Sequence, residues 1–235
     1  MPVASKYEDI IARFDEARRR VDGENTFITL SFAQSLDGSV SLRPGERTHL
    51  SGESSLEMTH ALRARHDAIV VGIGTVLVDN PRLSVRLNGT ADQPLRVILD
   101  RDLRTPPSAQ LFSSVGGPVH LICDESAPRE REQALRDKDA TIWRWPTPDL
   151  EPARLRLRLR DLGIKTAMVE GGAAIISRIL DAGCADYAVL TIVPVLTAHR
   201  NTVRYDQGVH GHAYDLGHCH RTLIDGDVVL DGPFR

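Results

Sequence analysis

Short, largely apolar runs recur along the chain and predict the strands of a buried sheet. Runs of this kind, bounded by turn residues, are typical of strands that are covered on both faces. They are residues 27–32, 68–71, 95–99, 119–123, 166–169 and 187–193. Predicted helices lie between several of them, at residues 54–63, 129–136, 152–162 and 173–182. Strands that alternate with helices predict an α/β fold with a largely parallel sheet.

An amphipathic helix is predicted at residues 7–20, ahead of the main body. Its apolar residues share one helical face: Ile10, Ile11, Phe14 and Ala17. We therefore divide the chain into an N-terminal helical extension, residues 1–25, and one main domain, residues 26–235. No long Gly/Ser-rich or Pro-rich linker divides that domain further.

Turn signals place two extended segments outside the main run of strands. Asp37-Gly38 is a turn signal that leads into a short extended run at residues 39–42. The Asp37 carboxylate also lies at a strand end, where a substrate can reach it. Near the C-terminus, residues 223–230 are predicted to form the closing strand.

Two of the helices need a closer argument. Ser54 and Glu57 have the spacing of a capping box, which predicts the start of one helix. The segment 152–162 contains alternating Arg and Leu, and this period of two taken alone predicts a strand. However, Pro152 suits a first helical position and Gly163 suits the position after a helix end, so we predict a helix with a solvated arginine face.

Bulk composition narrows the class of protein. The 235 residues carry a formal net charge of −3, whereas a dedicated nucleic-acid-binding domain normally has a basic excess. The three cysteines are widely spaced, so neither a disulfide framework nor a CxxC zinc site is predicted. The charged N-terminus lacks a secretory apolar core, and no apolar run approaches the roughly 18 residues of a membrane span. We expect a soluble, cytoplasmic protein without nucleic-acid or membrane partners.

Two glycine turns each follow a predicted strand and precede a predicted helix. They are Gly72-Ile73-Gly74-Thr75 and Glu170-Gly171-Gly172-Ala173. Free N–H groups at a helix N-terminus suit a phosphate or pyrophosphate, although a tight turn without a ligand explains either turn alone. The first is not a GxGxxG fingerprint, because Leu77 stands where the third glycine belongs. Two such turns at strand ends of one parallel sheet favour a ligand crevice.

Charged residues near these turns extend the predicted crevice. Asp100 and Arg101 follow a predicted strand, where an acid can bind a ribose hydroxyl and an arginine can bind a 2′-phosphate. A surface turn explains them equally well. Arg63, Arg65 and Arg86 flank the first glycine turn, and guanidinium groups bind phosphate oxygens bidentately. For Arg63, stabilisation of a helix dipole is an alternative role.

Metal and nucleophilic chemistry have little support in the sequence. Histidines gather late in the chain, with one cysteine among them: His210, His212, His218, Cys219 and His220. Residues two apart share a face of an extended segment, but no further ligand spacing completes a zinc site. No GxSxG elbow is present. We therefore predict no metal and no protein nucleophile.

Four segments, taken in order, carry a resemblance to a known family. They are FAQSLDGSVSL, LSGESSLEMTHALRARHDAIVVGIGTVLVDNPRLSVRL, PLRVILDRDLRTP and MVEGGAAIISRILDAGCADYAVLTIVPVL. Over residues 26–196 the chain resembles the pyrimidine reductases of riboflavin biosynthesis, which form the RibD C-terminal-domain family. The zinc deaminase signature (H-x-E with P-C-x-x-C) is absent, so the chain resembles the stand-alone reductases.

The resemblance implies a dihydrofolate-reductase-like fold, with a mixed, mainly parallel sheet flanked by helices, usually in a homodimer. It implies an enzyme that uses NADPH to reduce the ribosyl group of a 5-amino-6-(5-phosphoribosylamino)pyrimidine to a ribityl group. Whether the pyrimidine is the diamino or the deaminated form stays open. Such chemistry needs no protein nucleophile, because the cofactor supplies the hydride.

The resemblance also implies a role for individual residues. The positions at the NADPH are Ala33, Thr75, Asp79, Asp100, Arg101, Gly171, Gly172 and Ala173. The positions around the ribosyl phosphate and the pyrimidine are Arg63, Leu83, Arg86 and Glu170. Asp37 and Glu170 are the candidates for catalytic proton handling.

The chain departs from the family pattern after Leu196, where Thr-Ala-His-Arg-Asn replaces the usual glycines, and the likeness fades beyond Asn201. Two alternatives therefore stay open. One is an NADPH reductase of the same fold that acts on another pyrimidine or a pterin-like substrate. The other is a non-catalytic nucleotide-binding homologue.

Overall fold

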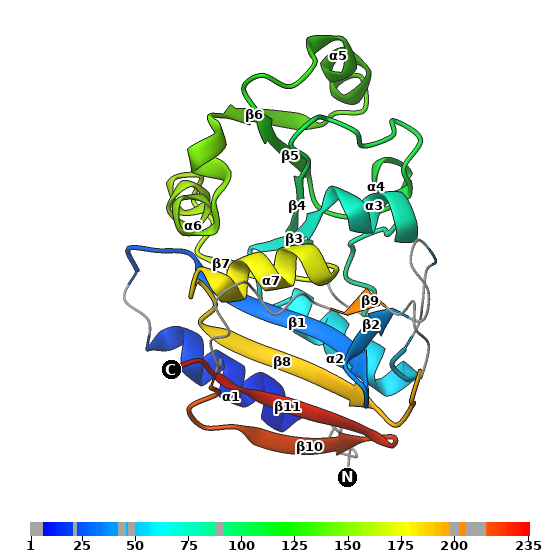
Figure 1. The fold of residues 1–235 in the computed structure, drawn as a ribbon, viewed down its shortest axis with the longest axis vertical. Helices are drawn as coiled ribbons and strands as arrows, with labels where there is room; N and C mark the ends of the chain where they lie inside the picture. The colour runs from blue at the N-terminus through cyan, green and yellow to red at the C-terminus, as the bar shows by residue number, and fades with distance from the viewer. Residues whose placement is uncertain are drawn as a thin grey trace.

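The computed structural model describes residues 7–20, 23–41, 46, 50–87, 92–197, 203–204 and 215–235. The strands of its main sheet are β1 (Phe27–Ser35), β3 (Ala68–Gly72), β4 (Leu95–Leu99), β5 (Val119–Asp124), β6 (Thr141–Trp145), β7 (Thr166–Val169), β8 (Tyr187–Val193), β10 (His220–Ile224) and β11 (Asp227–Pro233). They lie in the order β10-β11-β8-β1-β7-β3-β4-β5-β6 (Figure 1). A separate two-stranded ribbon pairs β2 (Ser39–Ser41) with β9 (Val203–Arg204).

The main sheet is mixed and mainly parallel, which confirms the predicted architecture. The strands from β8 to β6 run parallel, whereas β11 pairs antiparallel with β8 and β10 pairs antiparallel with β11 at that edge. All six strands predicted from apolar runs are present. The chain leaves a place between β1 and β3 that β7 fills later, and a reversal of strand order of this kind creates a crevice at the strand ends.

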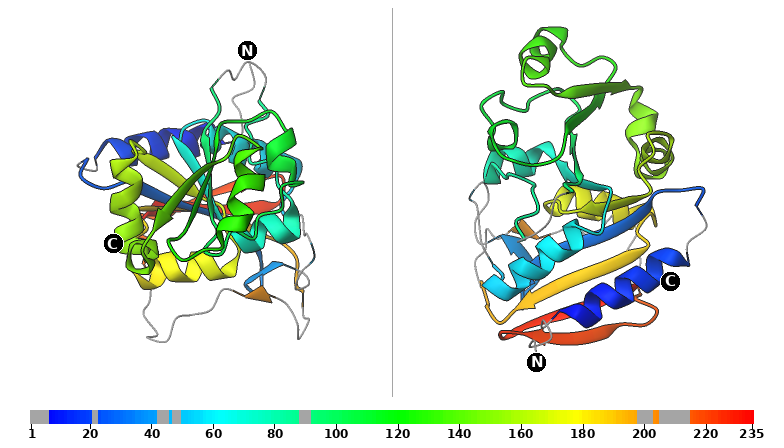
Figure 2. Two further views of the ribbon diagram at one scale, coloured as in Figure 1. Left: turned by 90° about the horizontal axis from the view of Figure 1, so that it is seen from above. Right: turned by 180° about the vertical axis from the view of Figure 1, so that it is seen from behind.

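Helices cover both faces of the sheet (Figure 2). They are α1 (Glu8–Arg19), α2 (Glu53–Arg63), α3 (Ile73–Asp79), α4 (Gln110–Ser113), α5 (Glu132–Arg136), α6 (Pro152–Asp161) and α7 (Ala173–Asp181). On one face, α1 and α2 pack against β7 and β8 in a buried cluster that includes Phe14, Leu62 and Met168. On the other face, α6 and α7 contribute Leu159 and Ile179 to a second buried cluster. None of the helices in the described segments has both the length and the apolar character needed to cross a membrane.

The predicted N-terminal helix is present as α1, and it is built into the core. Ile10 and Phe14 are completely buried. Arg13 donates to the fully buried Asp231 carboxylate from Nε at 2.8 Å and from Nη2 at 2.6 Å. The Tyr187 hydroxyl donates to the same carboxylate at 2.7 Å. This network ties α1 to β11 and β8, so the helix shares the core of the main domain, and a separate extension over residues 1–25 stays a prediction.

The Arg-Leu alternation forms α6, as predicted. Leu155 and Leu159 are buried against the sheet, as a helical spacing requires. The intervening Arg156 donates to both oxygens of Asp186, at 2.6 and 2.7 Å. Arg154 and Arg158, whose side chains are more exposed, pair with Asp149, so the predicted solvated arginine face holds for these two and not for Arg156.

The predicted capping box at the start of α2 is wrong. The helix begins one residue earlier, with Gly52 as its N-cap, and no side chain of its own caps it. Ser54 donates instead to Asp225, which lies far away in the sequence. Asp227 accepts the Gly52 N–H at 3.1 Å and the Ser55 hydroxyl at 2.7 Å. A carboxylate from β11 thus replaces the local cap.

The predicted closing strand is a hairpin. Asp225 and Gly226 both have positive φ, at 50° and 100°, and they turn the chain between β10 and β11. Asp-Gly is a common two-residue hairpin turn, because both positions accept the left-handed backbone conformation that such a turn requires. The sequence analysis also missed β6 and the short helix α4.

A buried histidine predicts how the stability of the fold depends on pH. The ring of His66 bonds to the carbonyl oxygen of Leu62 at 2.8 Å and to Thr29 Oγ1 at 2.9 Å, and the residue is only 5% exposed. Burial lowers the pKa of His66 from 6.5 to about 4. Between these values the unfolded chain binds more protons, so stability falls as the pH falls. We expect proton uptake by His66 in the unfolded chain to lower the free energy of unfolding by about 2 kcal/mol when the pH falls from 7 to 5.

Urea unfolding at these two pH values tests this expectation. Other groups also titrate in this range, so the wild type is compared with His66→Gln, which lacks the titrating imidazole. The free energy of unfolding of the variant should change less between the two conditions. An identical change in both proteins would contradict the assignment.

Candidate active site

The candidate site lies where neighbouring parallel strands end. Glu170 follows β7, and β3, the neighbour of β7, ends at Gly72. Ala33 lies near the end of β1, on the other side of β7. A cavity of about 510 Å³ lies among these strand ends, α2, α3 and the segment after α3. The topology therefore brings together residues that are far apart in the sequence.

Most of the predicted site residues line this one cavity. They are Ala33, Arg63, Thr75, Asp79, Leu83, Arg86 and Glu170. Sequence reasoning missed other lining residues, among them Ser31 and Thr59. Both have a spacing that could have revealed them. Ser31 is two residues before Ala33 on the same strand, and Thr59 is one helical turn before Arg63.

An ion pair between Arg63 and Glu170 forms one wall of the cavity. Arg63 Nε donates to Glu170 Oε1 at 2.6 Å, and Nη2 donates to Oε2 at 2.5 Å. Nη1 donates to the carbonyl oxygen of Ser84 at 2.9 Å. Burial acts to lower the pKa of Arg63, but the charge and hydrogen bonds of Glu170 outweigh it and raise that pKa. The guanidinium that was expected to bind phosphate is thus largely engaged in holding Glu170 and the chain at Ser84.

The two glycines of the second turn are required for different reasons. A Cβ on Gly171 would lie 1.7 Å from Ile175 Cγ2, so only glycine fits the packing there. A Cβ on Gly172 would meet only Thr75 Oγ1, at 3.8 Å. Gly172 is the N-cap of α7, and its N–H donates to Thr75 Oγ1 at 3.3 Å. The N-terminus of α7 is therefore joined to the cavity wall through Thr75, with open space beside Gly172.

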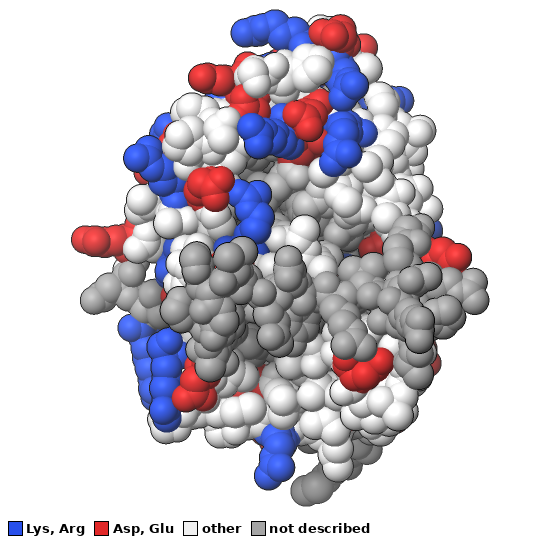
Figure 3. Space-filling model, in the orientation of Figure 1, with Lys and Arg blue, Asp and Glu red and all other residues white. Residues whose placement is uncertain are grey.

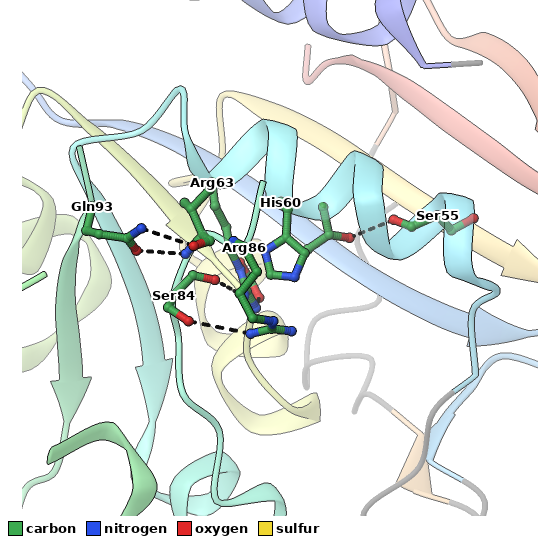
Figure 4. Close-up of polar contacts among 9 residues, drawn as sticks. Ser55, His60, Arg63, Ser84, Arg86 and Gln93 are labelled. Carbon is green, nitrogen blue, oxygen red and sulfur yellow. Dashed lines mark hydrogen bonds and ion pairs between the residues drawn. The ribbon is translucent and has the colours of Figure 1, made fainter. Parts of the chain in front are cut away.

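The segment after α3 carries a second arginine to the cavity (Figure 4). Arg86 is exposed, and its Nη1 donates to Ser84 Oγ at 3.5 Å. Behind it, His60 is only 4% exposed. Sequence reasoning did not select His60, although it lies three residues before Arg63 on the same face of α2.

Two predicted carboxylates stabilise turns instead of facing the cavity. Asp37, expected to be catalytic, accepts bonds from Ser35 Oγ at 2.6 Å and Thr197 Oγ1 at 2.7 Å, and it is not among the lining residues. Asp100, expected at the cofactor, is completely buried and accepts bonds from Thr105 N and Oγ1, both at 2.7 Å. Each carboxylate is bound by its own or a neighbouring loop, and the roles expected of Asp37 and Asp100 stay predictions.

Arg101 and Ala173 are not among the residues that line the cavity. Arg101 is exposed at the end of β4, where its Nη2 reaches Thr147 Oγ1 at 3.5 Å. Ala173 is the first residue of α7. Their expected contacts with a cofactor stay predictions.

The surface charges and the histidines add little to this site. Figure 3 shows acidic and basic side chains intermixed on the described part of one face. Within the described residues, no group of three or more His, Cys, Asp or Glu is placed to share a metal ion. His210 and His212 lie outside those residues, while His218 and His220 are exposed beside β10 or in it.

The fold and the site define an α/β protein with a crevice, lined by Arg63 and Arg86, at the carboxyl ends of a mainly parallel sheet. The chain belongs to the RibD C-terminal domain family, whose model matches residues 26–228. The match extends from the start of β1 into β11, and α1 precedes it.

Known relatives are similar over most of the chain. The chain is 34% identical over 205 residues to the 2,5-diamino-6-ribosylamino-4(3H)-pyrimidinone 5′-phosphate reductase of Methanothermobacter thermautotrophicus, covering 86% of this chain and 85% of that protein. It is 37% identical over 187 residues to the protein of the same name from Debaryomyces hansenii, covering 72% and 75%. The structure of the riboflavin biosynthesis reductase Rib7 from Saccharomyces cerevisiae has a TM-score of 0.77 at 23% identity, over 97% of this chain and 100% of that one. At this identity the structural likeness concerns the fold.

Proposed function

We propose that this protein is an NADPH-dependent reductase that converts the ribosyl group of 2,5-diamino-6-ribosylamino-4(3H)-pyrimidinone 5′-phosphate to a ribityl group. Relatives at 34% and 37% identity are named as reductases of this compound. One observation carries the proposal. A single cavity contains the Arg63–Glu170 pair, Arg86 and Thr75, and Thr75 accepts the N–H of the glycine turn that begins α7.

The residues of this chain fit the phosphate groups of a dinucleotide. Gly172 leaves open space at the N-terminus of α7, where backbone N–H groups and the helix dipole favour an anion. Thr75 and Asp79, both on α3, line the same cavity. NADPH, when bound there, supplies the hydride. The chain contributes the orientation of the two reactants and the placement of charge.

The opposite wall of the cavity suits a phosphorylated sugar. The exposed guanidinium of Arg86 can bind the 5′-phosphate with charge-assisted hydrogen bonds. Opening of the ribosylamine ring to an imine makes C1′ the hydride acceptor. When the hydride is added to C1′, the imine nitrogen must gain a proton. Of the two residues expected to handle protons, Asp37 and Glu170, it is Glu170 that lines the cavity, and Arg63 fixes its orientation. We assign proton handling to Glu170.

NADPH oxidation measured with the diamino substrate and with its deaminated form tests this function. We expect turnover of at least one, with the diamino form preferred. Activity only on another pyrimidine or on a pterin would support the first alternative. NADPH binding without turnover of any such compound would reject the reductase and support a nucleotide-binding homologue.

A homodimer is part of the same proposal, because the family resemblance implies it. Light scattering on the purified full chain measures the mass in solution. A mass of one chain at assay concentrations would reject the dimer without affecting the proposed reaction.

A further inference from the structure

Residues 81–87 carry Leu83 and Arg86 to the site, and we call this segment the site strap. It follows Asn80, which ends α3 with a left-handed φ of 43°, and it contains neither helix nor strand. Leu83 anchors the strap, since its side chain is only 2% exposed. Leu83 also has a positive φ of 52°, a conformation that is uncommon for a residue other than glycine. The strap therefore depends on neighbouring groups to keep its shape.

Side chains from other elements hold the strap through its backbone. Arg96 Nη1 donates to the carbonyl oxygen of Arg82 at 3.2 Å, and Arg63 Nη1 donates to the carbonyl oxygen of Ser84 at 2.9 Å. The amide of Gln93 accepts the N–H of Val85 at 2.8 Å and donates to its carbonyl oxygen at 3.0 Å. His60 Nδ1 accepts the N–H of Arg86 at 3.3 Å. Figure 4 shows His60 and Arg63 on α2 and Gln93 in the segment before β4, with Ser84 and Arg86 between them. Of these residues of the strap, Arg86 is the one whose guanidinium is proposed to bind phosphate, and His60 holds its backbone N–H.

We propose that His60 is a positioning residue, whose Nδ1 holds the backbone N–H of Arg86 and so directs the Arg86 guanidinium toward the phosphate of the substrate. The identity of that substrate rests on the proposed function. The contact between His60 and Arg86, and its effect on phosphate binding, can be tested without knowing which pyrimidine is reduced. His60 and Arg63 lie on one face of α2, so a single helix holds Ser84, Arg86 and Glu170 in register.

The position of His60 keeps its imidazole in the form that this contact needs. Burial, together with the charges of Arg63 and Arg86, lowers the pKa of His60 to about 4. A neutral imidazole offers one nitrogen lone pair as an acceptor, whereas an imidazolium has only donors and would repel the N–H of Arg86. Burial therefore contributes most to keeping the histidine neutral, the charges of the two arginines add to it, and a backbone hydrogen bond with Ser84 acts to raise the pKa.

Two substitutions of similar size separate the acceptor from the bulk of the side chain. In His60→Asn the amide oxygen can occupy the place of Nδ1, whereas in His60→Gln it reaches past that place. We expect His60→Gln to weaken the binding of ribose 5-phosphate about fivefold to tenfold, as the loss of one hydrogen bond predicts, and His60→Asn to weaken it less. Calorimetric titration with ribose 5-phosphate measures this. With the full substrate, KM should rise while kcat stays close to the wild-type value.

A double-mutant cycle tests whether His60 acts through Arg86. In an Arg86→Ala background, His60→Gln should cause no further loss of ribose 5-phosphate affinity. His120→Gln is the matched control, because His120 Nδ1 accepts a bond from Trp143 Nε1 at 3.2 Å on the far side of the sheet. That variant should bind ribose 5-phosphate like the wild type.

The outcomes separate this inference from the proposed function. Wild-type protein that binds ribose 5-phosphate through Arg86 but reduces no pyrimidine substrate would reject the function and leave the role of His60 standing. Undiminished affinity in His60→Gln, an equal loss in His120→Gln, or an effect that persists without Arg86 would overturn the role of His60. So would wild-type protein that does not bind ribose 5-phosphate. If His60→Gln does not fold, His60→Ala, which also removes the acceptor, replaces it in both backgrounds, with His120→Ala as its control.

Discussion

Glu170→Gln is expected to lower kcat/KM of the reductase roughly a hundredfold to a thousandfold. Positioned acids and bases contribute effects of this size, and Glu170 is the candidate for proton handling that lines the cavity. Glutamine has nearly the same shape and still accepts one hydrogen bond from Arg63. However, the buried guanidinium, only 8% exposed, then lacks its counter-charge, so we also expect about 2 kcal/mol of lost stability. Steady-state kinetics and urea unfolding measure the two effects.

Arg63→Lys is the matched comparison for this variant. It keeps the positive charge and leaves the Glu170 carboxylate in place, but it loses the bidentate geometry. If Glu170 handles the proton, Arg63→Lys should lose much less of kcat than Glu170→Gln. A Glu170→Gln enzyme with normal kcat and a raised KM would restrict Glu170 to binding.

The strands of this fold could be predicted because burial on both faces imposes a simple pattern. Runs such as 68–71 and 166–169 are apolar at nearly every position, since their alternate residues pack into buried clusters on both faces of the sheet. β6 escaped prediction because it is an edge strand, and polar residues interrupt its sequence Thr-Ile-Trp-Arg-Trp. The hairpin of β10 and β11 escaped because its Asp-Gly turn lies inside an apolar run.

The position of the site could be predicted, but the direction of individual side chains could not. Both Asp37 and Asp100 follow a strand at the correct edge of the sheet, which is all that sequence spacing can establish. In the folded chain, backbone and hydroxyl donors of nearby loops bind these carboxylates, notably Thr197 for Asp37 and Thr105 for Asp100. Whether a carboxylate faces a crevice or its own turn depends on such donors, and Thr197 lies 160 residues from Asp37.

The pairing of Arg63 with Glu170 is a second contact that sequence spacing could not predict. Both residues were placed at the site, yet their ion pair spans 107 residues and depends on α2 crossing the end of β7. That contact changes the chemistry expected of Arg63, because a guanidinium that holds a carboxylate has less capacity for phosphate. Arg86, with its exposed side chain, is therefore the stronger candidate for the phosphate than Arg63.

Gly172→Val is expected to weaken NADPH binding roughly a hundredfold while leaving the fold intact. The backbone of Gly172 has φ −73° and ψ 178°, which a residue with a side chain can adopt. A Cβ there has no protein neighbour closer than Thr75 Oγ1 at 3.8 Å, so the fold tolerates it. The branched side chain would instead fill the space at the N-terminus of α7 that the pyrophosphate needs. NADPH titration by fluorescence and thermal unfolding measure affinity and stability.

Substitutions at neighbouring positions make this test specific. Ala182→Val adds the same bulk at the opposite, exposed end of α7 and should leave NADPH affinity unchanged. Gly171→Ala should instead destabilise the fold, because its Cβ would overlap Ile175. The two adjacent glycines are therefore expected to fail in different ways, one in ligand binding and the other in packing. Full NADPH affinity in Gly172→Val would contradict the proposal that the pyrophosphate binds at the N-terminus of α7. The cofactor would then have to bind elsewhere than beside the Arg63–Glu170 pair.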